Sequence, residues 1–212
     1  MAVKRIIIPN KWVGLAGDTK PTVTTYPRVR DGDTFLEYDT GRLYITHDGT
    51  NWVVKERDGI GYTSQPTTTR PADTTQYTAG DVVGGAITFT KIGAISRHII
   101  ILDADLRYDV TAVPSGMTSF TLYLYNITPP SAIADNAAWD LPAGDRASYL
   151  GYILLGSPVD VGSTLFVQQT DVNQPILMGT TTSLFGYLVT TGTYTPAANS
   201  ETLAVRLSSV GL

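Results

Sequence analysis

Alternation of apolar and polar residues is the dominant pattern in the later part of the chain. In residues 118–126, Phe120, Leu122 and Leu124 fall on one side of the expected strand, and Tyr123 and Tyr125 fall on the other. Because side chains alternate across a strand, we expect one set in a core and the other facing solvent or a neighbour. Similar patterns predict strands at 86–92, 97–106, 118–126, 148–155, 164–169, 176–178, 184–190 and 202–208. About eight strands separated by turns predict an all-β protein with an antiparallel, jelly-roll-like β-sandwich.

A second, smaller pattern precedes the sandwich and predicts a β-meander. Short strands are expected at residues 34–38, 43–47 and 52–55, joined by turns at 39–41 and 48–51. Asp-Gly turns between aromatic and β-branched residues are strong hairpin signals. A sheet of this size is marginal alone, so its apolar side chains need a surface to pack on.

The composition between these patterns suggests a division of the chain. Residues 61–85 are rich in threonine, proline and glycine, and we expect a junction there. The predicted parts are an N-terminal meander or anchoring module at 1–60, this junction, and the sandwich at 86–212. The only helix we predict covers residues 132–139, between the Pro129-Pro130 pair and Pro142.

Charge and cysteine content narrow the classes of function. The 212 residues carry a formal charge of −4 without a run of like charges, so we expect no nucleic acid or membrane partner. Cysteine is absent, which excludes disulfides and thiolate metal sites. The apolar run at residues 3–8 is too short for a signal-peptide core or a membrane span, so we expect synthesis in a cytoplasm.

Candidate catalytic residues are few. Asp103 and Asp105 share a strand face, as paired carboxylates in an active site would, but no histidine or third acid joins them, and we interpret them as a solvated strand end. Asp31 and Asp33 lack the spacing of a calcium loop and predict a turn. His47 and His98 lie in different modules, which argues against a histidine metal site. We therefore expect no enzymatic activity, no cofactor and no metal.

Four ordered segments between residues 65 and 212 resemble a family of virion proteins of tailed bacteriophages. They are T-R-P-A-D-T-T-x-Y-x-A-G-D-V-V-G at 69–84, the I-I-x-L-x-D-A-type strand at 99–105, the segment ending A-D-N-A-A-W at 120–139, and L-F-G-x-L-V through L-x-V-R-L at 184–207. Residues 32–53 look like a small repeat found in phage structural proteins. The resemblance implies a structural role on the particle and supplies no catalytic residues.

The resemblance implies a capsid decoration, or cement, protein on the outer surface of the phage head, made in the bacterial host. Its expected partners are the major capsid protein and further copies of itself, as a homotrimer by analogy. Candidate capsid-anchoring residues in the N-terminal part are Ile6, Ile7, Ile8, Trp12, Leu36, Ile45 and Trp52. Candidate subunit-interface residues are Ile99, Ile101, Tyr123 and Tyr125.

Two other classes of function stay open at this point. One is a tail-fibre or receptor-binding module of the phage tail, in which Tyr123 and Tyr125 would stack on a host surface glycan. The other is a hydrolase such as a depolymerase, which needs a clustered pair of acids that the sequence does not offer convincingly.

Overall fold

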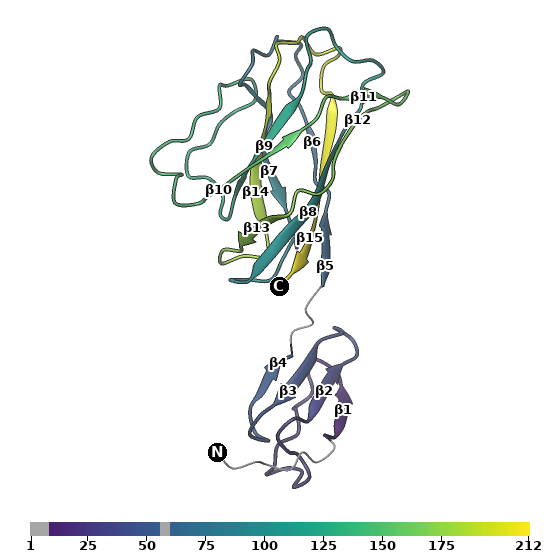
Figure 1. Cartoon of the computed structure of the whole chain (residues 1–212), viewed down its shortest axis with the longest axis vertical. Coiled ribbons are helices and arrows are strands. Elements are labelled where there is room, and N and C mark those ends of the chain that lie inside the picture. Colours follow the sequence, from purple (N-terminus) through teal and green to yellow (C-terminus); the bar gives the residue numbers. More distant parts are fainter. Residues whose placement is uncertain (1–8, 56–59) are drawn as a thin grey trace. The chain divides into compact units, whose positions relative to one another are not determined.

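The computed structural model describes residues 9–55 and 60–212, which belong to two compact units, Met1–Asp58 and Gly59–Leu212 (Figure 1). The apolar run at residues 3–8 lies outside the described residues. Each unit is built from strands and has its own sheets, so each is considered by itself.

The N-terminal unit is a four-stranded sheet in the order β1-β2-β3-β4. Its strands are β1 (Lys11–Gly14), β2 (Thr34–Glu37), β3 (Leu43–Thr46) and β4 (Trp52–Val54). The three meander strands are confirmed, and β1 adds to them in parallel with β2. Gly41 and Gly49 have φ of 71° and 73°, the left-handed conformation that glycine adopts readily in such turns.

The C-terminal unit contains the remaining strands. They are β5 (Gly61–Ser64), β6 (Thr67–Thr69), β7 (Val82–Phe89), β8 (His98–Tyr108), β9 (Phe120–Tyr125), β10 (Tyr149–Leu155), β11 (Val159–Asp160), β12 (Leu165–Gln169), β13 (Gln174–Leu177), β14 (Leu184–Thr190) and β15 (Thr202–Gly211). One sheet has the order β10-β9-β14-β7. The other runs β11-β12-β8-β15-β5, with β13 paired to β8 and β6 paired to β15.

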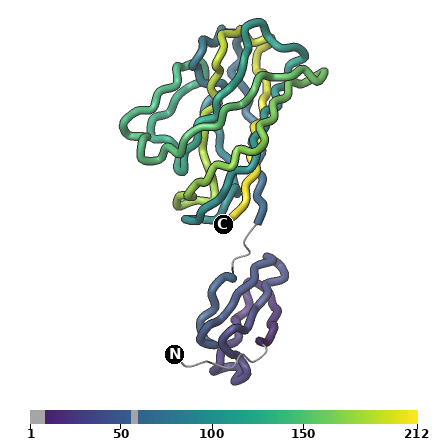
Figure 2. Tube along the Cα trace, in the orientation of Figure 1, coloured from purple at the N-terminus to yellow at the C-terminus, as the bar shows by residue number. Residues whose placement is uncertain are grey.

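The pairing of these strands defines a jelly roll. β5 and β6 pair with the last strand, β15, and β7 pairs with β14. On the other side of β15, β8 pairs with β12, and on the other side of β14, β9 pairs with β10. The C-terminal unit is thus a long antiparallel hairpin folded over into two sheets. Figure 2 shows the yellow C-terminal strand beside the teal β8. The antiparallel β-sandwich predicted from the sequence is therefore confirmed.

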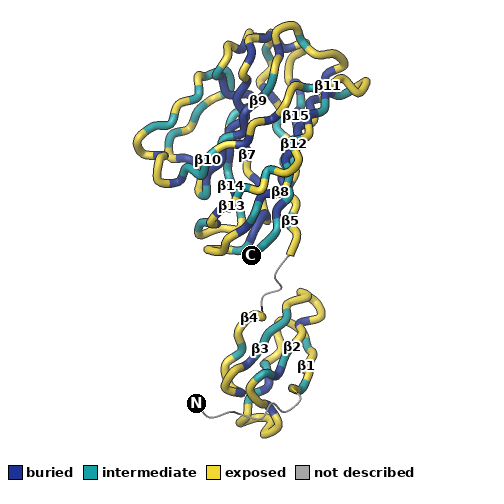
Figure 3. The backbone as a smooth tube through the Cα atoms, viewed as in Figure 1, coloured by how far each residue is buried: buried dark blue, intermediate teal, exposed yellow. Residues whose placement is uncertain are grey.

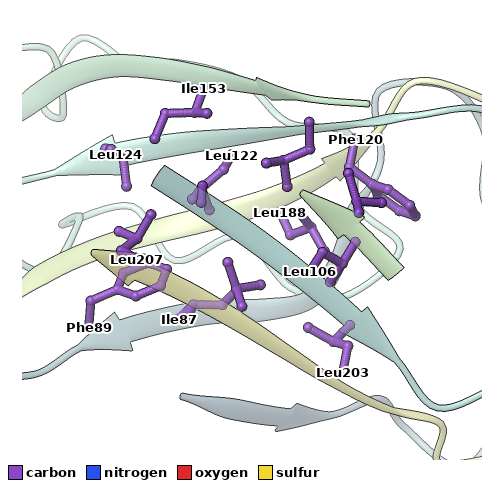
Figure 4. Packing of buried hydrophobic residues seen from close by; sticks show 14 of the residues in the cluster. Ile87, Phe89, Leu106, Phe120, Leu122, Leu124, Ile153, Leu188, Leu203 and Leu207 are labelled. Atoms are coloured by element: carbon purple, nitrogen blue, oxygen red, sulfur yellow. The ribbon is translucent and has the colours of Figure 1, made fainter. Parts of the chain in front are cut away.

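The main core lies between these two sheets. Phe120, Leu122 and Leu124 of β9 meet Leu106 of β8 and Leu207 of β15, as Figure 4 shows. All five side chains are almost completely buried. Burial of each such side chain stabilises the fold by about 1.5–3 kcal/mol, so the alternation read from residues 118–126 identifies a real core face.

The predicted junction at 61–85 is wrong, because this segment forms strands of the sandwich. β5, β6 and the beginning of β7 all lie within it, and the first two pair with β15. Pro66 lies between β5 and β6, where no ladder hydrogen bond is interrupted. The boundary between the two units falls after Asp58 instead.

The predicted helix at residues 132–139 is also wrong. The backbone there bonds to β7 and the residues before it: Asn136 N donates to Val82 O, Val82 N to Ala137 O, and Trp139 N to Gly80 O, at 2.8–2.9 Å. These long-range bonds replace the i−4 bonds that a helix would need. The segment crosses the outer face of the four-stranded sheet instead of forming a helix.

Candidate functional site

The two faces of the N-terminal sheet differ, and the strand register assigns each residue to one of them. Trp12 and Phe35 are paired neighbours, Phe35 pairs with Tyr44, and Thr46 pairs with Trp52, so these side chains share one face. The positions between them belong to the opposite face. We call the face of Trp12, Phe35, Tyr44 and Trp52 the covered face, and the opposite face, with Val13, Leu36, Leu43, Ile45 and Val53, the open face.

The loop at residues 15–33 packs on the covered face. Trp52 Nε1 donates to the carbonyl of Pro21 at 2.6 Å, and Phe35, which is 3% exposed, meets the Trp52 ring edge-on at 6.0 Å between centroids. Trp12 Nε1 donates to Asp33 Oδ2 at 3.1 Å, and the Trp12 ring lies against Tyr26. These contacts make the covered face the small core of the unit.

Two buried carboxylates hold this loop to the sheet. Burial raises the pKa of Asp33, but hydrogen bonds from Asn10, Trp12 and the Arg30 backbone outweigh burial and keep that pKa below its ordinary value. The hydrogen bond from Lys20 Nζ, 2.7 Å long, with a second from Thr40, lowers the pKa of Glu37 to about 2. The predicted turn at Asp31 and Asp33 is confirmed, and its buried carboxylate already accepts bonds from the protein.

The open face carries apolar side chains that no described residue of its own unit, in the range 9–55, covers. Val13, Leu36 and Val53 are 66%, 38% and 50% exposed, and Leu43 and Ile45 are half-buried. Leu36 lies between Val13 and Leu43, and Ile45 lies beside Val53, so the five side chains are contiguous. In Figure 3, β1 alternates between exposed and intermediate residues, and β4 is mostly exposed. Large contiguous apolar patches are rare on soluble monomers and mark interaction surfaces.

The candidate anchoring residues therefore divide into two groups. Leu36 and Ile45 lie on the open face, where a partner can reach them. Trp12 and Trp52 lie on the covered face and support the unit itself. Ile6, Ile7 and Ile8 lie outside the described residues. The anchoring candidates did not include Val13, Leu43 and Val53, although the alternation in 52–55 was a usable signal for Val53.

Burial contradicts the predicted interface role of three of the four candidate subunit-interface residues. Ile99 and Ile101 have no exposed surface because they point from β8 into the core between the sheets. Tyr125 is also fully buried, and burial raises its pKa to about 12. A side chain without exposed surface cannot contact a second subunit, so these three are core residues.

Tyr123 and Tyr125 were expected to face outward, but a second small core covers them. Trp139 stacks on Tyr123 with ring centroids 3.6 Å apart and an interplanar angle of 11°. Trp139, Ile133 and Leu141 belong to the 127–147 segment between β9 and β10, and they pack against a buried cluster that contains Tyr125. The part of the outer sheet face around these two tyrosines is thus covered, and one face of the Tyr123 ring is unavailable for stacking on a sugar.

The T-R-P-A-D-T-T-x-Y segment builds a buried polar network. Arg70 Nε donates to the hydroxyl of Tyr77, which donates to Asp135 Oδ1 at 2.5 Å. On the other side of Arg70, Nη1 lies 3.5 Å from Glu201 Oε2, which also accepts a 2.6 Å hydrogen bond from the Tyr108 hydroxyl. Burial, with the charge of Glu201 nearby, raises the pKa of Tyr108 and keeps it neutral. The network is structural: it ties β6 to the 127–147 segment and to the start of β15.

Asp103 and Asp105 are not a solvated strand end. They lie within β8, next to Arg206 of β15, whose Nη2 is 2.5 Å from Asp105 Oδ2 and 3.6 Å from Asp103 Oδ1. The Asp105 side chain is almost fully buried, and burial raises its pKa although Arg206 opposes the rise. This cross-strand ion pair explains both acids without a catalytic role.

The described part of the chain contains neither a cluster of metal-binding side chains nor a membrane-spanning helix. No group of three or more His, Cys, Asp or Glu side chains in residues 9–55 and 60–212 is placed to hold a metal ion. Within the same residues, no helix is long and apolar enough to span a membrane.

No family model and no curated protein matches the chain. Among solved structures, it is similar to a chain of desmodium yellow mottle tymovirus, with 12% identity over 74% of this chain and 89% of that one, at a TM-score of 0.25. It is also similar to a chain of mud crab tombus-like virus, with 13% identity over 76% and 85% of the two chains, at a TM-score of 0.28. A chain of the infectious bursal disease virus VP2 subviral particle is 13% identical and 47% covered, at a TM-score of 0.19. The class assigned here, a jelly-roll β-sandwich, rests on the strand pairing within this chain.

Proposed function

We propose that this protein is a structural component of a virion, a decoration protein on the outer surface of a tailed-phage head. In this proposal the N-terminal unit binds the major capsid protein and the sandwich is displayed. Neither a cofactor nor an enzymatic activity is part of the proposal. The jelly roll and the four segments resembling phage virion proteins support it.

One observation carries the proposal: the open face of the N-terminal sheet. The unit has a core on its covered face, yet Val13, Leu36 and Val53 remain exposed on the other. Such a face is expected where a protein joins a larger assembly. In the sandwich, by contrast, the 127–147 segment covers the part of the outer face of the four-stranded sheet around Val82, Tyr125 and Tyr187.

A homotrimer remains the proposed assembly state, but its contact needs residues other than the buried ones predicted. Edge strand β10 offers Tyr152 and Leu154, which are 54% and 62% exposed. Both point to the outer side of their sheet, since Tyr152 pairs with Tyr123 and Leu154 with Thr121. This strip is our choice for the contact between sandwiches.

The tail-fibre alternative loses its main support, because it relied on outward Tyr123 and Tyr125. Tyr125 is buried and Tyr123 is stacked on Trp139. No observation on the sandwich favours a glycan partner in their place.

Separating heads from tails in purified virions, followed by mass spectrometry of each fraction, tests the proposal. We expect this protein in the head fraction, and we expect antibodies against it to label intact heads. Recovery with the tails alone would contradict a decoration role.

A further inference from the structure

The charged residues at the edges of the open face form a defined pattern. The face has two rows of four positions, one from each strand. The first row is Lys11, Thr34, Ile45 and Val53; the second is Val13, Leu36, Leu43 and Lys55. Lys55 belongs to the second row because its backbone N–H donates to the Leu43 carbonyl at 2.7 Å.

The two lysines occupy opposite corners of this array, with the apolar side chains between them. Lys11 is at the β1 end of one row and Lys55 at the β4 end of the other, and both are exposed. None of the eight positions carries a carboxylate. The face therefore presents an apolar centre and a cationic charge at each of two diagonal corners.

From this pattern, and resting on the proposed function, we infer that the open face docks on an apolar protein surface of the capsid that is bordered by carboxylate side chains. The apolar rows supply contact area, and Lys11 and Lys55 pair with the carboxylates to fix the orientation of the unit. Complementary charges at an interface rim favour encounter and select against wrong partners.

Charge also argues against other occupants of the face. A second copy packed face to face would bring lysines without a carboxylate partner, and unpaired like charges disfavour such contacts. An anionic membrane needs a stronger basic surface, whereas residues 1–58 hold nine Lys and Arg against eight Asp and Glu. A carboxylate-bordered protein surface satisfies both the apolar rows and the corner lysines.

Adjacent residues of β4 provide a matched pair of variants. Val53 is 50% exposed on the open face, and Val54 is 51% exposed on the side of the covered face, since it pairs with Tyr44. An aspartate at either position places the same charge on the same strand with equal exposure. Only Val53→Asp puts it into the proposed contact.

The test is co-sedimentation of the full-length chain with phage heads prepared without this protein. We expect Val53→Asp to weaken binding by about tenfold or more and Val54→Asp to bind like the unchanged protein. The double change Lys11→Glu and Lys55→Glu should weaken binding by a similar factor, and the loss should shrink at high salt. The double change Lys91→Glu and Arg146→Glu, at exposed positions of the sandwich, alters the net charge equally and is the control.

Different outcomes separate this inference from the proposed function. If the unchanged chain binds heads and Val53→Asp binds as well as Val54→Asp, the open face is not the contact, while the decoration role survives. If the unchanged chain does not bind heads, both fail. Loss of an oligomer in Val53→Asp by analytical ultracentrifugation, or flotation of the unchanged chain with anionic vesicles, would assign the face to another occupant and overturn the inference.

Discussion

The hydroxyl of Tyr77 donates a 2.5 Å hydrogen bond to Asp135, a residue 58 positions further along the chain. Asp135 accepts a second bond, 2.6 Å long, from the backbone N–H of Gly84. Through these two bonds the motif at residues 69–84 holds the 127–147 segment on the outer face of the four-stranded sheet. The most distinctive sequence motif of the chain therefore acts in folding.

Asp135→Ala should destabilise the sandwich by about 1–3 kcal/mol, because Tyr77 and Gly84 would each lose an acceptor. Urea unfolding followed by circular dichroism measures this change. Asp140→Ala, an exposed residue in the same segment, is the control and should leave the midpoint nearly unchanged. Equal effects of the two changes would show that the Asp135 bonds contribute little.

Arg70→Leu should destabilise the sandwich more strongly, by about 3–5 kcal/mol, since Glu201 would stay buried without its cation. Adding Glu201→Gln should recover part of the loss, because the unpaired charge is then removed. The free energies of unfolding of the two single variants and the double variant form a cycle. Purely additive effects would argue against the Arg70–Glu201 pairing.

The N-terminal unit should lose stability in acid, because the two carboxylates that hold its loop to the sheet then become protonated. Asp33 and Glu37 have folded pKa values below their ordinary ones, so their contribution is complete above the unfolded values near 4 and is lost as pH falls through the folded values, which for Glu37 is about 2. A Trp139→Phe variant keeps only Trp12 and Trp52, so its tryptophan fluorescence reports the N-terminal unit alone. We expect their emission to shift between about pH 4 and 2, and Asp33→Asn to weaken the dependence. Constant emission down to pH 2 would contradict this role of the two carboxylates.

Leu154→Asp should dissociate the proposed homotrimer into monomers of 22.8 kDa, because it places a charge on the exposed strip of β10. Sedimentation equilibrium measures the change. Leu177→Asp is the matched control, since Leu177 is 50% exposed on β13 in the other sheet. A trimer that persists in Leu154→Asp would place the subunit contact elsewhere.

The sequence predicted the parts of this fold that depend on local periodicity. The alternation of Phe120, Leu122 and Leu124 identified the inner face of β9, and the Asp-Gly turn after His47 located a hairpin. Periodicity separates the two faces of a strand but does not tell what lies against each. For that reason Tyr125 was assigned outward, although the 127–147 segment buries it.

Features that depend on partners distant in the sequence could not be predicted from the sequence. Arg70 and Glu201 are 131 residues apart, and nothing local marks either as a buried ion. Pro66 and the glycines of 61–85 look like a linker, because the strand that completes this segment's sheet is the last one of the chain. In the N-terminal sheet, strand β1 and the covering loop decided which face stayed open, so Trp12 and Trp52 could not be separated from Leu36 by sequence alone.

Attachment of the protein to the head through its N-terminal unit is tested by the binding of a 60–212 fragment to heads prepared without this protein. The fragment keeps every strand of the sandwich, including β5, and should fold. We expect full-length protein to bind these heads and sediment with them, while the folded fragment stays in the supernatant. If the fragment decorates the heads as well as the full chain does, the sandwich holds the attachment site and the claim is contradicted.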